Sequence, residues 1–206
     1  MLIRHRGAEP VVDPTAWVAP NATLVGDVRI GPDVRVLYGA VLDAEGSRIE
    51  VGESSIVSEH AVLRATAVTD SGAAVSVGDH AFIGPHATVL GATAGRCAYL
   101  AAQSTVLHLA RLGAGASVAV GALVHARTVL PDEFFVPPHN TAIGDPVRVL
   151  SPDRADELAA AIRDTAFADA AFGVRAEWSD RIARYERVAK VRAAEYAAHA
   201  DDTTVG

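Results

Sequence analysis

Residues 98–130 have the sequence AYLAAQSTVLHLARLGAGASVAVGALVHARTVL, in which a pattern recurs every six residues. A branched aliphatic residue stands at each step, and a small or β-branched residue precedes it by two positions. The aliphatic positions are Leu100, Val106, Leu112, Val118, Val124 and Leu130. A period of six fits neither the 3.6-residue period of a helix nor the two-residue period of a strand. Six residues can form one short strand and one turn, and three such units can close a triangular coil. The stretch therefore predicts a left-handed parallel β-helix built from hexapeptide repeats.

The same six-residue step extends over most of the chain. It begins near Val18 and is interrupted by a small excursion at residues 44–48 and by a longer segment, residues 65–74, which we expect to leave the coil as a loop. Residues 131–146 are rich in proline and are expected to leave the ladder of strands. The pattern predicts that residues 1–150 form one β-helix domain with a short N-terminal lead-in.

Residues 151–200 have a helical pattern instead. Ser151 is placed to cap a first helix over residues 152–167, and apolar residues recur on one stripe of a second helix over residues 175–199. We expect both helices to pack along the flank of the β-helix, and we expect residues 201–206 to be disordered. The predicted fold class is mainly β, with a C-terminal α-helical extension.

The composition narrows the classes of partner and compartment. A net charge of −7, without a run of basic residues, argues against nucleic acid as the main partner. The single cysteine, Cys97, excludes an internal disulfide framework and indicates a reducing compartment. The first residues lack the apolar region of a signal peptide, and no apolar run is long enough to span a bilayer. We therefore expect a cytoplasmic protein that does not enter a membrane.

Three stretches resemble the γ class of carbonic anhydrases. They are PTAWVAPNATLVGDVRIGPDVRVLYGAVL at residues 14–42, VGDHAFIGPHATVLGATAG at residues 77–95 and IGDPVRVL at residues 143–150. The resemblance covers about residues 10–150 and implies a left-handed β-helix that assembles as a homotrimer, with sites in the clefts between subunits. In that family, three histidines from two neighbouring subunits hold a zinc ion that activates water for attack on carbon dioxide.

The residues at the family's zinc positions differ from that pattern. The three histidines correspond to Arg64, Pro85 and Leu90, none of which offers a ligand to zinc at neutral pH. An Arg-Gly-Asp segment that joins subunits in the family is replaced by Asp-Ala-Glu at residues 43–45. The resemblance thus implies a family member whose usual zinc site has been replaced. We expect no resident cofactor, and zinc held by relocated histidines stays open as an alternative.

The repeat also predicts which side chains meet. Three six-residue steps make one coil, so residues three steps apart stack at the inter-strand spacing of ~4.8 Å. One predicted column contains Leu42, Leu63, Val89, Val106 and Val124. The next residue in each case is Asp43, Arg64, Leu90, Leu107 or His125. Asp43 and Arg64 are therefore expected to form an ion pair with a separation within ~4 Å.

The candidate site lies in the expected cleft between subunits. Arg64 would supply a fixed positive charge in place of zinc and bind a carboxylate or oxyanion of a small substrate. His86 or His125 would transfer a proton, and the reaction would be a lyase or hydrolase type. The remaining candidate catalytic residues are Asp43 and Glu59. The candidate substrate-binding residues are Tyr38, Glu45, Gln103 and His108. Glu59, His86 and Gln103 would come from the neighbouring subunit.

Other functions fit the same sequence. Asp43 and Arg64 can be a purely structural ion pair at a trimer interface. The chain can be a non-catalytic scaffold or regulatory trimer, which exposed apolar surface on residues 175–199 would favour. Hexapeptide helices also include acyltransferases, and relocated zinc ligands could be His86, His108 and His125. The other histidines are expected at the surface or in turns: His5, His60, His80, His139 and His199.

Overall fold

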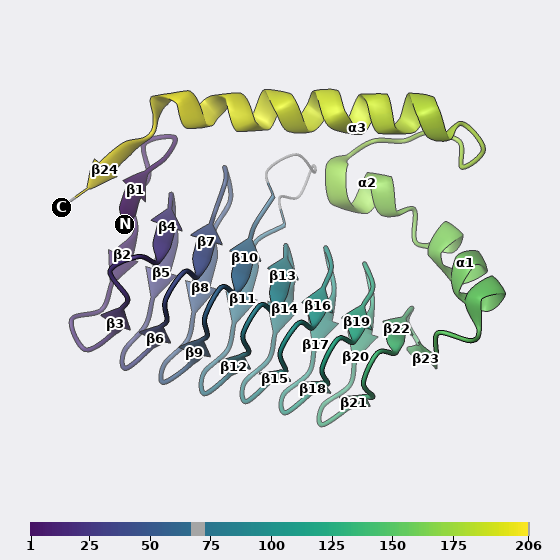
Figure 1. Cartoon of the computed structure of the whole chain (residues 1–206), viewed down its shortest axis with the longest axis horizontal. Helices are drawn as coiled ribbons and strands as arrows, with labels where there is room; N and C mark the ends of the chain where they lie inside the picture. The colour runs from purple at the N-terminus through teal and green to yellow at the C-terminus, as the bar shows by residue number, and fades with distance from the viewer. Residues whose placement is uncertain (67–72, 206) are drawn as a thin grey trace.

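The structure, a computed structural model, describes residues 1–66 and 73–205. Short strands wind into a triangular coil, and successive coils stack into an elongated prism (Figure 1). Within the described residues, the three faces of the prism are one ten-stranded sheet and two seven-stranded sheets. Neighbouring strands of each face are parallel, apart from one antiparallel strand at either end of the first face. The predicted parallel β-helix is confirmed.

The strands fall into three sets. The first face consists of β1 (Leu2–Arg4), β4 (Thr23–Val25), β7 (Val41–Asp43), β10 (Val62–Arg64), β13 (Thr88–Leu90), β16 (Thr105–Val106), β19 (Leu123–Val124), β22 (Thr141–Ile143), β23 (Arg148–Leu150) and β24 (Thr203–Val205). The second face consists of β2 (Val11–Val12), β5 (Val28–Ile30), β8 (Ile49–Val51), β11 (Val75–Val77), β14 (Thr93–Ala94), β17 (Arg111–Leu112) and β20 (Val129–Leu130). The third face consists of β3 (Trp17–Val18), β6 (Arg35–Val36), β9 (Ile56–Val57), β12 (Phe82–Ile83), β15 (Tyr99–Leu100), β18 (Ser117–Val118) and β21 (Phe135–Val136).

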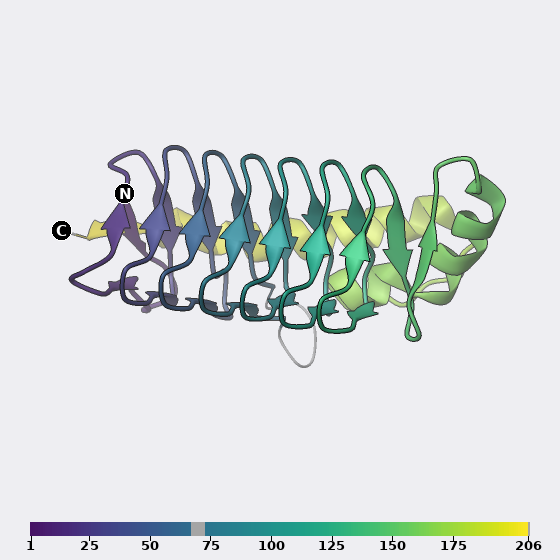
Figure 2. The same cartoon turned by 90° about the horizontal axis from the view of Figure 1, so that it is seen from below.

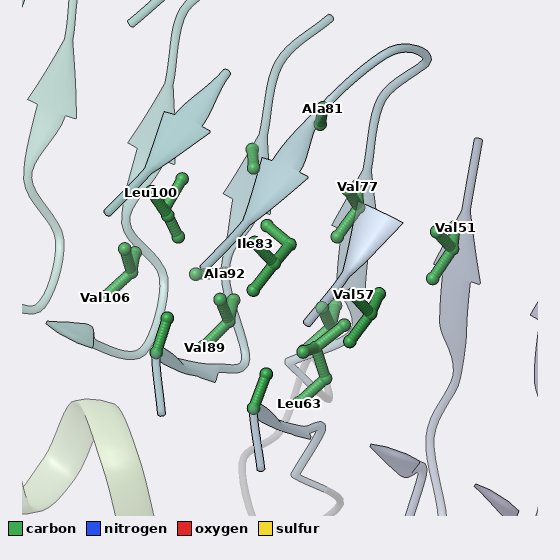
Figure 3. Close-up of a cluster of buried hydrophobic side chains, with 14 of the residues drawn as sticks. Val51, Val57, Leu63, Val77, Ala81, Ile83, Val89, Ala92, Leu100 and Val106 are labelled. Carbon is green, nitrogen blue, oxygen red and sulfur yellow. The ribbon is translucent and has the colours of Figure 1, made fainter. Parts of the chain in front are cut away.

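The aliphatic residues of the repeat fill the inside of the prism. Leu63, Val89 and Val106 point inward and meet Ile83 and Leu100 of the third face (Figure 3). The predicted column is confirmed, since the pairing register aligns its members in order: Leu42, Leu63, Val89, Val106 and Val124. The small residues two positions earlier are buried at the corners, where larger side chains would not fit.

The proline-rich segment stays in the ladder, contrary to the sequence expectation. β21 pairs with β18 and β22 pairs with β19, so Val136 and Ala142 continue the six-residue step. Pro131 and Pro137 directly follow β20 and β21, the end strands of their sheets, and Pro138 lies in a turn. The matching residues of the preceding coil, Gly113 and Ala119, donate their N–H to the carbonyls of Leu130 and Val136, but among the described residues no further coil follows to accept from Pro131 or Pro137. Proline is therefore compatible with the coil at these positions, and the ladder ends only where β23 turns back antiparallel to β22.

The C-terminal extension is divided into more helices than the two expected. They are α1 (Ala155–Asp164), α2 (Phe167–Phe172), α3 (Arg181–Tyr196) and a short 3-10 helix, η1 (Ala197–Asp201). Ser151 does not cap α1, which begins after Arg154; its hydroxyl donates to the Asp153 carboxylate instead. α2 ends at Gly173, whose φ of 64° lies in the left-handed region. α3 begins after Asp180, whose carboxylate accepts a hydrogen bond from the Ala183 N–H.

The extension returns along the whole prism. α3 runs beside the coils from the β22 end back towards β1, as the two perpendicular views show (Figures 1 and 2). β24 then pairs antiparallel with β1, with Ile3 opposite Thr204. The expected disorder of residues 201–206 is therefore wrong for residues 203–205. β1 is the edge strand of the first face, and its free backbone groups favour pairing with an extended segment that α3 delivers there.

The sequence analysis also predicted a loop that interrupts the coil at residues 65–74 and no membrane-spanning segment. The expected loop over residues 65–74 falls largely outside the described residues; at its base, Thr66 and Ala73 form an antiparallel bridge. None of the helices in residues 1–66 and 73–205 has the length and hydrophobicity that crossing a bilayer requires.

Candidate functional site

The predicted site residues occupy two corners of the prism, at opposite ends of the first-face strands. The corner that follows these strands lies beneath α2 and α3, and we call it the covered edge. It carries Asp43, Glu45, Arg64, His108 and His125. The corner that precedes the strands is the open edge. It carries Tyr38, Glu59, His86 and Gln103.

Asp43 and Arg64 form the ion pair that the repeat predicted. They are register partners on β7 and β10, and Arg64 Nε lies 3.5 Å from Asp43 Oδ2. The same nitrogen lies 3.7 Å from Glu45 Oε1. Both carboxylates are buried, at 5% and 4% exposed. Arg64 therefore neutralises charge that would be costly to bury alone.

α3 completes the charge balance at this end of the covered edge. Arg192 donates to both carboxylate oxygens of Glu45, with Nη1 3.0 Å from Oε2. The Tyr196 hydroxyl accepts from Arg192 and, at 3.1 Å, from Nη1 of Arg64. Burial alone would lower the pKa of Arg192, but the hydrogen bonds to Glu45 and Tyr196 outweigh it and raise that pKa. Two arginines thus face two carboxylates, and Tyr196 of the returning helix contacts both arginines. Arg64 Nε is buried and has the two longer ion-pair contacts but no hydrogen bond among the described residues.

His108 and His125 lie under α2, in an apolar setting. Both rings are within 6.0 Å of the Phe167 ring, and His108 also lies 5.9 Å from the Phe172 ring. Nδ1 of each histidine is buried without a hydrogen-bond partner among the described residues. Burial, and secondarily the charge of Arg192, lowers the pKa of His108 to about 4, and burial lowers the pKa of His125 as well. Both rings are therefore neutral at pH 7.

The open edge consists of turn residues. His86 and Gln103 have φ values of 58° and 61°, in the left-handed region that the corner requires. The N–H of His86 donates to the Glu59 carbonyl, and its ring stacks on that of His60 with the centroids 5.2 Å apart. A three-residue strand separates the open edge from the covered edge, which is about 10 Å at ~3.3 Å per residue. In one chain the two predicted halves do not meet, so their contact requires a second copy.

Three polar residues that the sequence did not single out meet beside this site. Asp202 Oδ1 lies 2.6 Å from Nδ1 of His5, and Asp202 Oδ2 lies 2.9 Å from Nδ1 of His199. The two imidazole rings stack with their centroids 4.4 Å apart. Burial would raise the pKa of Asp202, but the hydrogen bonds from His199 and His5 lower it overall.

The surface position expected for His5 is wrong, because its side chain is 1% exposed. His199 is half-buried and its Nε2 lies 3.8 Å from Asp43 Oδ2, so this cluster continues the network of Arg64. His5 and Asp202 are 197 positions apart, and only the return of α3 brings them together. The repeat pattern contains no signal for such a contact.

Comparisons with known proteins agree with this architecture. The chain is 30% identical over 138 residues to gamma carbonic anhydrase 2, mitochondrial, of Arabidopsis thaliana, covering 63% of this chain and 50% of that protein. It is 42% identical over 57 residues to the carbonic anhydrase of Methanosarcina thermophila, covering 27% of this chain and 23% of that protein. It is 33% identical over 135 residues to the carboxysome assembly protein CcmM of Synechocystis, covering 62% of this chain and 20% of that protein.

A solved structure shares the fold over nearly the whole chain. It is a hexapeptide transferase family protein from Anaplasma phagocytophilum, with a TM-score of 0.57, 24% identity and coverage of 93% of this chain and 96% of that one. No family model matches the sequence. The fold defines the class: the chain is a hexapeptide-repeat β-helix protein. Within that class, its sequence is similar to those of γ-class carbonic anhydrases. It spans half or less of the length of these curated relatives.

The sequence resemblance assigns Arg64, Pro85 and Leu90 to the zinc-ligand positions of the γ class, and the chemistry of these three residues does not suit that ion. Arg64 places a cation at the first ligand position, and Asp43, Glu45 and Tyr196 already contact it. Pro85 and Leu90, at the other two positions, have no side-chain atom that binds metal. We therefore derive no reaction step through zinc at this position.

Proposed function

We propose that this chain is a non-catalytic structural member of the γ-carbonic-anhydrase-like proteins and assembles as a homotrimer. The observation that carries the proposal is the network of ion pairs at the covered edge. Arg64 and Arg192 balance the buried carboxylates of Asp43 and Glu45, and the Tyr196 hydroxyl accepts from both arginines. The sequence resemblance places Arg64 at a zinc-ligand position of the family, and in this chain Arg64 belongs to an internal ion-pair network, which supports a structural role.

The same network argues against Arg64 as a strong binding group for an anionic substrate. A substrate carboxylate at Arg64 would approach two buried negative charges, both within 3.7 Å of the Arg64 Nε atom. Like charges at such distances repel each other strongly when water is excluded. A substrate would therefore have to displace Asp43 or Glu45 before the guanidinium could bind it.

The surface of α3 supports a role in assembly. Ile182 and Tyr185, near the start of α3, are 78% and 58% exposed, and Trp178, in the turn before the helix, is 43% exposed. Apolar side chains on the returning helix are the feature expected of a scaffold that holds a partner. Among the relatives, CcmM is named a carboxysome assembly protein. The homotrimer is supported by the relationship to γ carbonic anhydrases.

The proposal is tested on the full-length, tag-free protein. Light scattering should give three times the monomer mass. Stopped-flow assays should detect no carbon dioxide hydration above the buffer rate, and NMR titration with acetate or bicarbonate should show no saturable binding. Arg64→Gln should change none of these results, and Arg29→Gln, at an exposed arginine, is the matched control. Saturable anion binding or turnover that Arg64→Gln abolishes would contradict the structural role.

A second candidate is a metal-free enzyme that acts on a small carboxylate or acyl substrate between subunits. The Arg64 side chain is 35% exposed, and His86 is exposed on the open edge, so a second copy could bring them together. Arg64 would bind the substrate's carboxylate or oxyanion, and His86 would transfer the proton. His125 fits that role less well, since Phe167 packs on its ring.

Two other functions have weaker support. The transferase-family structure shares only the fold, so it supports no acyltransferase site in this chain. Zinc held by His86, His108 and His125 is disfavoured within one chain, because His86 lies on the open edge and the other two lie under Phe167 on the covered edge.

A further inference from the structure

We propose that His5, His199 and Asp202 form a binding site for one divalent transition-metal ion, with zinc as the ion that fits best. One ligand atom from each residue can be chosen so that all three lie within 4.8 Å of one another. None of these three residues stands at a position that the sequence resemblance assigns to the family's zinc ligands. The cluster meets the Arg64 network at one point, where His199 Nε2 lies 3.8 Å from Asp43 Oδ2. The inference therefore goes beyond the proposed structural function.

The donor atoms suit zinc in kind and spacing. Two imidazole nitrogens and one carboxylate oxygen are a common protein ligand set for zinc, with bonds of about 2.0–2.2 Å. Tetrahedral coordination at that length places ligand atoms about 3.3 Å apart. The two Nδ1-to-carboxylate distances involve different oxygens of Asp202: 2.6 Å from His5 to Oδ1 and 2.9 Å from His199 to Oδ2. With one ligand atom from each residue, all three atoms lie within 4.8 Å, so shifts of about 1.5 Å or less bring every pair to this spacing.

The shorter distances match a metal-free state in which protons occupy the place of the ion. In that state the Asp202 carboxylate accepts one hydrogen bond from each imidazole Nδ1–H. A neutral imidazole that binds a metal through Nδ1 carries its single proton on Nε2, so in each ring the proton would leave Nδ1 and one would be taken up at Nε2. The two hydrogen bonds would then be replaced by metal–ligand bonds. Zinc binds imidazole in its neutral form and aspartate in its ionised form.

A further carboxylate is placed to orient one ligand. If His199 binds through Nδ1, its Nε2 faces Asp43 Oδ2 at 3.8 Å. A second carboxylate on the far nitrogen of a metal-binding histidine fixes its ring and increases its basicity. His5 is buried on the other side of the site, whereas the side chains of His199 and Asp202 are 30% and 19% exposed. Zinc can therefore enter from this side, where a water can fill the fourth position.

The site joins the two ends of the described fold. His5 follows β1, His199 lies in η1 and Asp202 immediately precedes β24. Because His5 and Asp202 are 197 positions apart, the unfolded chain does not present them together. Zinc would therefore bind the folded chain far more strongly than the unfolded chain. Once bound, it would hold α3 and β24 against the prism.

The experiment uses chelator-treated, full-length, tag-free protein. Calorimetric titration with zinc should give one ion per chain, and cobalt(II) should give the strong visible absorption of tetrahedral coordination. Zinc should also raise the melting temperature. His199→Gln and Asp202→Asn, at partly exposed positions, should each weaken zinc binding at least tenfold and remove the thermal shift. His80→Ala, at an exposed turn, should leave both unchanged.

His5→Ala is the stronger variant and is used only if circular dichroism shows a native β-helix, because its ring is buried. Arg64→Gln should retain zinc binding, which separates this test from that of the proposed function. The inference is overturned if zinc binds without saturation, or if His199→Gln and Asp202→Asn both bind zinc as tightly as the wild type. It is also overturned if His80→Ala alone abolishes binding.

Discussion

The covered edge has two halves, one near β7 and β10 and one near β16 and β19. Both lie at equivalent corners of successive coils, yet their chemistry differs. Near β7 and β10, Asp43 and Arg64 pair beneath α3. Near β16 and β19, His108 and His125 are neutral, and their Nδ1 atoms have no hydrogen-bond partner among the described residues. The repeat sets where these side chains emerge, and the covering helix sets what they meet: Arg192 in the first half, Phe167 in the second.

This difference predicts how each half responds to change. Removing one member of a buried charge network leaves its partner charged and unpaired, which costs several kcal/mol. Replacing an unsatisfied neutral group with an apolar one of similar shape costs little or stabilises the fold. The charged half should therefore be sensitive to truncation, and the histidine half should be sensitive to pH.

The largest effect is expected from Arg192→Ala. Glu45, 4% exposed, would lose both hydrogen bonds to the guanidinium, and Arg64 at 3.7 Å would compensate only in part. We expect the free energy of unfolding in urea to fall by about 3 kcal/mol. Glu45→Gln in the same chain should restore part of the loss, since no unpaired charge then remains. Arg187→Ala, at an exposed position of α3, is the control. If Arg187→Ala lost as much stability as Arg192→Ala, the special sensitivity of the charged half would be refuted.

Acidification should act through the histidine half. The unfolded chain protonates His108 near its ordinary pKa of 6.5, whereas the folded chain does so only near pH 4. Between these values the unfolded state binds more protons, so the free energy of unfolding decreases as pH falls. The loss attributable to His108 is about 3 kcal/mol once pH is below 4, and His125 adds to it in the same direction.

The measurement is urea unfolding at pH 7 and pH 4.5 for the wild type and for His108→Leu. Carboxylates titrate in both proteins, so the difference between their pH dependences isolates His108. The variant should lose less stability on acidification than the wild type. His80→Ala, at an exposed turn, should behave like the wild type. An unchanged pH dependence in His108→Leu would show that the buried ring is not the sensor.

A smaller effect of opposite sign is expected from His125→Leu. The ring is 5% exposed, packs on Phe167, and has no hydrogen bond at Nδ1. An aliphatic side chain of similar volume keeps the packing and removes an unsatisfied polar atom. Thermal unfolding at pH 7 should show a gain of about 1 kcal/mol. A comparable loss instead would mean that the ring makes a polar contact essential to the fold.

The smallest effect is expected from Arg64→Gln. Its side chain is 35% exposed, its ion pairs are long at 3.5 and 3.7 Å, and Arg192 still neutralises Glu45. Asp43 keeps the hydrogen bond that the Glu45 N–H donates to its Oδ1 at 2.9 Å, so Arg64→Gln does not leave this carboxylate without a partner. Because the lost ion pairs are long and Arg64 is partly exposed, the loss in the urea assay should be at most about 1 kcal/mol, smaller than that of Arg192→Ala. Arg64 and Arg192 would then differ severalfold in their contributions, although both belong to one network. A loss as large as that of Arg192→Ala would place the main charge balance on Arg64.

The interior of the prism could be predicted from the sequence because its geometry repeats. A fixed step of six residues determines which side chains stack, so the Leu63 column and the Asp43–Arg64 pair followed from counting. The proline-rich segment was misjudged, because proline at a corner is compatible with the coil. Whether a proline fits depends on where it falls within the six-residue repeat, which the proline content of the segment does not reveal.

The covered edge could be predicted only in part. The residues that emerge there were identified, but their partners Arg192 and Tyr196 lie on a helix whose docking has no period to count. The contact of His5 with His199 and Asp202 has the same origin. Such contacts depend on the path of a segment more than a hundred residues away along the chain. They therefore become visible only in the structure.

The antiparallel strands at the two ends of the first face limit how molecules can associate. A stack of parallel coils would otherwise present an unpaired row of N–H and C=O groups, onto which the next molecule could add its own coil and begin a fibre. β24 on β1 and β23 on β22 occupy these rows with short strands of opposite direction. On this face a second molecule cannot continue the parallel ladder directly, whereas the other two faces end, within the described residues, in β2 and β20 and in β3 and β21, which carry no such strand.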